Sequence, residues 1–197
     1  LPLGRIPDLE KRGAILKQAQ NVMRRLYDET REDCAIDEWL AGLCGKVKIA
    51  TVGLPEVYHD STLRKIEELN VALAAIAGGG GGRVSTVITH GDFQGANIYA
   101  VGELENARLC LIDWEYTARR FHLYDALVFS ARSRFPAGLA LRLKMLKSAG
   151  RGGLPEWGWC RSETDKSGRL LDWMIACFLI EDLLVRLREQ ALPGLKS

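Results

Sequence analysis

Three polar side chains between Thr89 and Glu115 have the types and spacing of a phosphoryl-transfer site. The stretch reads THGDFQGANIYAVGELENARLCLIDWE, with a carboxylate at Asp92, a side-chain amide five residues later at Asn97, and a second carboxylate at Asp113. Such a site needs a carboxylate for the proton of the attacking hydroxyl, and it needs amide and carboxylate oxygens for Mg²⁺. The sequence therefore points to phosphoryl-transfer chemistry in this stretch.

The residues around Asn97 and Asp113 predict a β-hairpin that would place the two side chains together. Leu109 to Ile112 form a short apolar run typical of a buried strand, and Asn97 to Val101 form its partner. The polar residues 102–107 would form the turn. Asn97 and Asp113 would then lie at the same edge, where both can face one cation.

HGDFQGAN followed by LIDWE resembles the signature of the aminoglycoside phosphotransferase and choline kinase family, small-molecule kinases that share the protein-kinase fold. The resemblance covers residues 84–129 well and the flanking helical segments only in character. It implies that Asp92 is the catalytic base, and that Asn97 and Asp113 are ligands of Mg²⁺ and hence of the nucleotide, ATP or GTP.

The same resemblance implies supporting roles for three further residues. His90 would brace the loop, Glu115 would be a site-lining or structural acid, and Asp125 in the run YDAL would be a buried acid that opens the next helix.

Each of these residues also has a structural interpretation. Asp92, in a Gly-Asp pair, can be a turn residue, while Asn97 and Asp113 can be a cap and a strand-end acid. Taken together, the three favour the functional interpretation. For His90 a hydrogen-bonded structural histidine is favoured over a proton carrier, and for Asp125 a helix N-terminal or backbone-bonding acid is favoured over a catalytic one.

Length and composition indicate a folded globular protein. The 197 residues carry a formal net charge of +2, which gives no general attraction to nucleic acid or membrane. Five cysteines, an odd number without close metal-ligand pairs, favour reduced thiols in a cytoplasmic protein. No apolar run reaches the roughly 18 to 20 residues of a membrane helix, and the first residues have no apolar core of a signal peptide. The absence of an initial Met suggests a fragment or a trimmed chain.

Helical spacing predicts two long helices before the site, one from Asp8 to about Asp33 and one from a cap at Asp60 or Ser61 to Ala77. Between them we expect a short helical piece over Ile36 to Leu43 that stops at Gly45. A strand or extended link over Val47 to Val52 would follow.

A run of five glycines, residues 78–82, precedes a predicted strand over residues 84–88. The run lacks the GxGxxG and GxxxxGK[ST] arrangements, so it favours a flexible connector over a phosphate-binding loop. The predicted strand leads into the THGD loop.

After the site, YTARRF falls where kinase-like folds place a substrate-facing loop. Arg119 and Arg120 are either solvated surface charges, the favoured interpretation, or contacts for an anion. We expect helices over residues 124–132, from Pro136 to about Gly150, and over residues 169–190, with a loop over residues 151–158. The apolar residues of the last helix indicate core rather than a cofactor site.

The predicted fold class is α+β, mainly helical, as a protein-kinase-like C-terminal lobe with a small β-hairpin at the catalytic site. We expect a single domain, with a helical scaffold over residues 1–77, a catalytic and metal-binding segment over 84–115, and a helical subdomain over 116–197. No Gly-rich strand-turn-strand precedes the site, and Lys48 is the only candidate for a phosphate-gripping strand lysine. The N-terminal nucleotide lobe is therefore expected to be absent, and a longer chain or a partner would supply it.

The predicted function is transfer of the γ-phosphoryl group of ATP to the hydroxyl of a small molecule. The resemblance permits aminoglycosides, choline-like amines, amino acids or sugars as acceptors. One alternative is a catalytically silent kinase-like domain that binds a nucleotide or a partner protein. Another is a metal-dependent phosphohydrolase, which would need several metal-binding histidines in a chain that has three.

Overall fold

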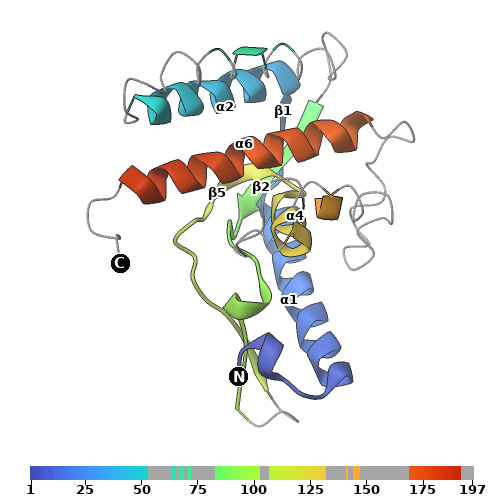
Figure 1. The fold of residues 1–197 in the computed structure, drawn as a ribbon. Helices are drawn as coiled ribbons and strands as arrows, with labels where there is room; N and C mark the ends of the chain where they lie inside the picture. Colours follow the sequence, from blue (N-terminus) through green and yellow to red (C-terminus); the bar gives the residue numbers. More distant parts are fainter. Residues whose placement is uncertain are drawn as a thin grey trace. The chain divides into compact units, whose positions relative to one another are not determined.

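The computed structural model describes residues 1–52, 64, 67–68, 71, 83–102, 107–131, 141, 144–146 and 169–191. This part of the chain is a mixed fold, mostly helical, with two small sheets (Figure 1). The chain divides into two compact units. Unit 1 comprises Leu1–Glu32 and Ser85–Glu163, and unit 2 comprises Asp33–Val84 and Thr164–Ser197.

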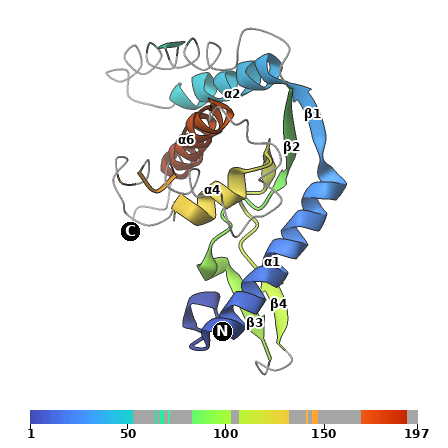
Figure 2. The same cartoon turned by 90° about the vertical axis from the view of Figure 1, so that its right-hand side faces the viewer.

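Helix α1, Leu9–Thr30, is the long helix of unit 1 and confirms the first predicted helix. Asp8 caps it, because the carboxylate accepts from the backbone N–H groups of Glu10 at 2.9 Å and Lys11 at 3.1 Å. A buried stripe recurs every four residues along one face, at Ile15, Ala19, Met23 and Tyr27. Figure 2 shows this helix running beside a β-hairpin.

The hairpin consists of β3, Ile98–Val101, and β4, Arg108–Leu111, paired antiparallel with Ile98 opposite Leu111. It confirms the predicted hairpin. The pairing continues one step beyond the strands, because the N–H of Ile112 donates to the carbonyl of Asn97 at 3.1 Å. Asn97 itself ends a short 3₁₀ turn, η2, Gly95–Asn97.

The first residues of the chain lie against the free edge of β3. The amino group of Leu1 donates to the carbonyl of Ala100 at 2.7 Å, and the N–H of Ala100 donates back to Leu1 at 2.9 Å. A short 3₁₀ helix, η1, Leu3–Arg5, follows. Figure 1 shows the N-terminus beside the hairpin accordingly.

The second sheet has the order β1–β2–β5, formed by Glu32–Ala35, Arg83–Thr89 and Ala118–Phe121. Strand β2 confirms the strand predicted before the THGD loop. Strand β5 corrects the loop expected for YTARRF: it pairs antiparallel with β2, and Phe121 at its end is fully buried. Neither β1 nor β5 has a clear alternation of apolar and polar residues, so cross-strand pairing decided their conformation.

Helix α4, Tyr124–Ala131, follows β5 directly and confirms the helix predicted there. Most of its residues are buried, among them the carboxylate of Asp125. A buried charged group at the start of an apolar helix needs hydrogen-bond partners, and these belong to the site described below.

Unit 2 contains α2, Ile36–Thr51, and α6, Arg169–Ala191, which pack on each other. The rings of Trp39 and Trp173 lie 5.5 Å apart between centroids. Helix α6 confirms the last predicted helix. Helix α2 corrects the expected stop at Gly45 and the expected strand over Val47 to Val52.

The physical reason for the longer α2 is the buried stripe that crosses the glycine. Leu40, Leu43, Cys44 and Val47 are all buried at helical spacing. A glycine in a helix interior costs about 1 kcal/mol relative to alanine, and burial of these apolar side chains outweighs that.

Several predicted elements lie largely outside the described residues. They are the helix from Asp60 or Ser61 to Ala77, the glycine run at 78–82, the helix from Pro136 to Gly150 and the loop at 151–158. Within them, the described positions 64, 67–68, 71, 141 and 144–146 are helical. In the described part of the chain, no helix combines the length and the apolar character needed to cross a membrane.

Candidate active site

Asp92 and Asn97 are in direct contact through their side chains. The Nδ2 atom of Asn97 donates both to the backbone carbonyl of Asp92 and to its Oδ2, each at 2.9 Å. Gln94 adds a third bond, from its Nε2 to Oδ2 of Asp92, at 2.9 Å. Both Asp92 and Asn97 are buried. Two amides on one oxygen therefore fix the rotation of the Asp92 carboxylate.

The bonds of Asn97 also determine which way its amide oxygen points. Both partners of Nδ2 are acceptors, so the NH₂ group faces Asp92. Because the two amide atoms lie on opposite sides of Cγ, Oδ1 of Asn97 is turned away from Asp92. An amide oxygen placed in this way is a donor of the kind that Mg²⁺ accepts.

Asp113 directly follows Ile112, the residue after β4, whose backbone N–H and carbonyl both form hydrogen bonds. The N–H of Ile112 donates to Asn97, and the carbonyl of Ile112 accepts from Nε2 of His90 at 2.9 Å. Asp113 is exposed and has a φ of 66°, a left-handed conformation that aspartate and asparagine tolerate better than most residues. In the hairpin register Asp113 directly follows Ile112, the residue opposite Asn97. Its backbone conformation is of a kind that often occurs at functional sites.

His90 joins the loop to the end of β4. Its Nδ1 accepts from the N–H of Asp92 at 3.3 Å, while Nε2 donates to the carbonyl of Ile112. These partners match the neutral tautomer with the proton on Nε2. The imidazole is fully buried, and its centroid lies 4.4 Å from the Trp114 ring. These are the contacts of a hydrogen-bonded structural histidine.

Asp125 holds the backbone of the loop from the start of α4. Its Oδ2 accepts from the N–H of His90 at 2.8 Å and from the hydroxyl of Tyr27 at 2.5 Å, and its Oδ1 accepts from the N–H of Gly91 at 2.9 Å. Complete burial raises the pKa of the Asp125 carboxyl, and the bonds from Tyr27, Gly91 and His90 act in the opposite direction. Asp125 therefore bonds to the backbone and lies behind the loop.

Gly91 is required by both its conformation and its surroundings. Its φ is 86°, and a Cβ atom added there would lie 2.2 Å from the backbone oxygen of Tyr116. That oxygen also accepts from Arg120 at 2.9 Å. The loop and the segment after Asp113 therefore approach each other more closely than any side chain at position 91 would allow.

Arg120 is buried, which corrects its favoured interpretation as a solvated surface charge. Arg119 is partly exposed and forms an ion pair, and a contact of either residue with an anion stays a prediction. Arg120 is buried, donates to Oγ1 of Thr89 at 2.7 Å, and lies 4.5 Å from the centroid of the Tyr124 ring. Arg119 pairs with Glu32 at 2.8 Å and donates to the carbonyl of Thr30, also at 2.8 Å.

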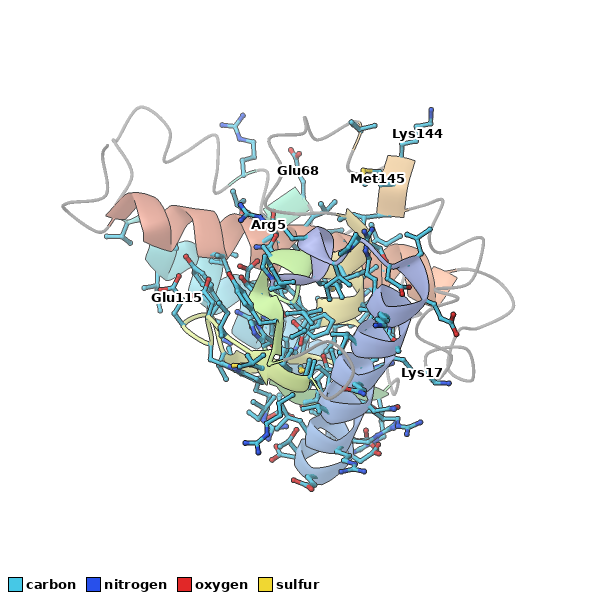
Figure 3. All side chains as sticks on the ribbon, turned by 90° about the horizontal axis from the view of Figure 1, so that it is seen from below. Arg5, Lys17, Glu68, Glu115, Lys144 and Met145 are labelled. Atoms are coloured by element: carbon cyan, nitrogen blue, oxygen red, sulfur yellow. The ribbon has the colours of Figure 1, made fainter. Side chains whose placement is uncertain are left out.

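Glu115, labelled in Figure 3, is exposed two residues beyond Asp113. Its role as a site-lining or structural acid stays a prediction. Among the residues that the structure describes, no group of three or more His, Cys, Asp and Glu side chains could hold a metal ion. Mg²⁺ does not need such a cage, because it is commonly held by one or two protein oxygens together with phosphate and water. The amide oxygen of Asn97 and the carboxylate of Asp113 fit that kind of binding.

The sequence did not reveal Tyr27, Gln94 and Arg120 as parts of this site. Tyr27 ends the buried stripe of α1, and its spacing in the sequence predicts only a core position. A buried tyrosine hydroxyl needs a partner, and the predicted buried acid at Asp125 was the signal that could have supplied one. Gln94 and Arg120 act through contacts that spacing along the chain does not predict.

Comparison with known proteins gives a weak structural likeness. No protein-family model and no curated protein matches the sequence. A solved glucosamine kinase in complex with glucosamine, ADP and inorganic phosphate is similar with a TM-score of 0.45 and 16% identity, over 95% of this chain and 50% of that chain. Two further crystal forms of glucosamine kinase, B and A, are similar with TM-scores of 0.39 and 0.40, each at 16% identity. They cover 98% and 92% of this chain, and 56% and 50% of theirs.

This chain therefore spans about half the length of the glucosamine kinase structures. At these TM-scores the likeness carries no argument about function, which is argued from the residues of the site.

Proposed function

We propose that this chain is the part of a small-molecule kinase that carries the catalytic base and the metal ligands. The reaction is transfer of the γ-phosphoryl group of ATP, or GTP, to a hydroxyl of a small acceptor. The observation that carries the proposal is the contact between the Asp92 and Asn97 side chains. The hairpin register, in which Asp113 directly follows the residue opposite Asn97, supports it.

Asp92 receives the proton of the acceptor hydroxyl and orients that hydroxyl for attack. Its carboxylate is suited to this because Asn97 and Gln94 fix its rotation before the acceptor arrives. A positioned general base contributes about 10² to 10⁴ in rate. His90 and Asp125 support the loop backbone and do not touch the reacting atoms.

Asn97 and Asp113 hold Mg²⁺ through the amide oxygen and the carboxylate. Bound there, the ion neutralises charge on the nucleotide phosphates. The orientation of the Asn97 amide, whose NH₂ group faces Asp92, and the exposure of Asp113 support this assignment.

The described residues of this site include neither a nucleotide lobe nor a defined pocket for the acceptor. A kinase site has a second lobe that covers the phosphates, and we propose that a longer chain or a partner supplies it. For the acceptor, the exposed carboxylate of Glu115 favours a hydroxyl compound that carries a positive charge. Glucosamine, named for the structural neighbours, belongs in any panel of candidates.

A thermal-shift screen of the full-length natural protein with nucleotides tests the proposal. ATP and GTP are each added with Mg²⁺ and with EDTA, alone and with a panel of amino sugars, aminoglycosides, choline-like amines and amino acids. A ligand at 100 times its Kd stabilises the folded state by about 2.7 kcal/mol, so a magnesium-dependent rise in Tm is the expected result. The absence of any such rise at millimolar nucleotide contradicts the proposal.

Phosphate assays then separate the three candidate functions. Acceptor-dependent transfer is the expected result for the full-length natural protein. Phosphate release without an acceptor would indicate a hydrolase instead. Nucleotide binding without any turnover would indicate the catalytically silent domain.

A further inference from the structure

Tyr27 makes a buried hydrogen bond to Asp125, the acid that holds the catalytic loop. The residue lies near the end of α1, it is 3% exposed, and its hydroxyl donates to Oδ2 of Asp125, 98 residues away in sequence. The same Oδ2 accepts from the N–H of His90, and Oδ1 accepts from the N–H of Gly91. Three donors from two parts of the chain thus meet on one carboxylate.

The carboxylate of Asp125 transmits this contact to Asp92. Rotation about the last side-chain bond of aspartate is soft, so the donors decide where the two oxygens lie. The oxygens in turn fix the N–H groups of His90 and Gly91. From His90 the connection continues to the N–H of Asp92 and to the carbonyl of Ile112. Asp92 and the end of β4 therefore depend on the same carboxylate.

The three bonds to Asp125 are stronger than their number suggests because they are formed away from water. Asp125 is fully buried, and hydrogen bonds to charged groups are stronger than neutral ones. Tyr27 supplies the only side-chain hydroxyl among them. The other two donors are the backbone groups that must be held in place, so they cannot orient the carboxylate independently of the loop.

We propose that Tyr27 is a positioning residue for the catalytic loop, whose hydroxyl orients Asp125 so that Asp125 holds His90, Gly91 and hence Asp92 in place. The catalytic role of this loop rests on the proposed function. The contact itself is independent of that function. Tyr27 acts on the loop through its hydrogen bond to Asp125.

A purely structural role for Tyr27 has different consequences. The ring completes the buried stripe formed by Ile15, Ala19 and Met23, and phenylalanine would fill that place equally well. Tyr27→Phe therefore removes the hydroxyl and keeps the packing. Ile15→Val is the matched control, because it disturbs the same stripe three turns away without touching the loop.

The first measurement follows the loop amides in the 197-residue chain by NMR. In Tyr27→Phe we expect the amide protons of His90 and Gly91 to change their chemical shifts and to exchange with solvent about tenfold faster, since one bond to their acceptor is lost. The same amides should keep their shifts and rates in Ile15→Val. Unchanged amides in Tyr27→Phe would overturn the proposal whatever the protein catalyses.

The second measurement is phosphoryl transfer by the full-length natural protein. We expect kcat to fall about tenfold in Tyr27→Phe while KM for nucleotide and acceptor stays within about twofold, because Asp92 is misplaced and the ligand contacts remain. An unchanged kcat would overturn the positioning role. If the wild-type protein transfers no phosphate while the loop amides respond as expected, the proposed function fails and the role of Tyr27 in holding the loop stands.

Discussion

At the scale of single residues, the loop between β2 and β3 is held by contacts that only a few residue types could make. Gly91 meets the backbone of Tyr116, and Asp125 accepts from the two consecutive amides of His90 and Gly91. The side-chain amides of Gln94 and Asn97 orient the Asp92 carboxylate. A loop fastened at this many points is preorganised, as a base that must meet a hydroxyl in one geometry requires.

Gly91→Ala should destabilise the protein by about 2 kcal/mol or more. A left-handed backbone costs a non-glycine residue roughly 1 to 2 kcal/mol, and the added Cβ would also push Tyr116 away. Urea unfolding measures the change. Gly13→Ala in α1 is the control, because a Cβ there meets nothing within 4 Å and should be neutral or stabilising. Equal stability of both variants would mean that the loop does not hold this close approach.

Asp113→Ala should weaken magnesium-dependent nucleotide binding, and Asn97→Ala should weaken it to a smaller extent. Both changes remove an oxygen assigned to the metal, and the carboxylate also carries the charge. Calorimetric titration of nucleotide with and without Mg²⁺ measures the effect. Asp113→Asn keeps a residue that tolerates the left-handed backbone, so its loss of affinity reports the charge alone. Full affinity in both alanine variants would remove the metal site from the account.

At the scale of elements, the spacing of apolar residues predicted the helices and strands that bury one face. The stripe of α1 and the hairpin of β3 and β4 have a clear period and were expected from it. The prediction failed where a local signal opposed the packing. Gly45 indicated a helix end, yet buried residues on both sides continue α2 to Thr51.

The residues of the site also divide into those that the sequence predicted and those that it could not. Asp92, Asn97 and Asp113 were predicted as a group because their types and spacing are visible along the chain. Tyr27 and Arg120 could not be assigned, because their roles depend on contacts across 98 and 31 positions.

Gly45→Ala tests the corrected extent of α2. In a helix interior the change should stabilise the protein by about 0.5 to 1 kcal/mol, and a Cβ at this position meets nothing within 4 Å. At a left-handed helix stop the same change would destabilise it. Gly102→Ala is the matched control, because its φ of 99° makes a loss of stability the expected result. A lower Tm for Gly45→Ala than for the wild type would restore the helix stop.

At the scale of the whole molecule, the residues proposed as the base and the metal ligands lie in one unit. The sequence predicts no covering glycine-rich loop, and Lys48 is its only candidate for a phosphate-gripping lysine. These contacts normally come from a second lobe, and they align the transferring group. Positioning supplies much of the rate in this chemistry.

The 197-residue chain should therefore fold, bind nucleotide weakly at best, and transfer phosphate at a negligible rate by itself. Circular dichroism, calorimetry with Mg²⁺ and nucleotide, and a transfer assay with the acceptor panel measure the three parts. Adding the remaining lobe of a longer natural chain, or a partner, should restore the rate. Robust acceptor-dependent turnover by the purified chain would show that its own residues grip the phosphates.

The most direct test of the central claim is the rate of acceptor-dependent phosphoryl transfer by Asp92→Asn in the full-length natural protein. We expect kcat to fall by about 10² to 10⁴, because asparagine cannot take the hydroxyl proton, while folding and nucleotide affinity stay close to those of the wild type. Asp28→Asn, at an exposed position of α1, should keep the full rate. A variant of Asp92 that retains most of its turnover would contradict the assignment of the base and, with it, the proposed function of the site.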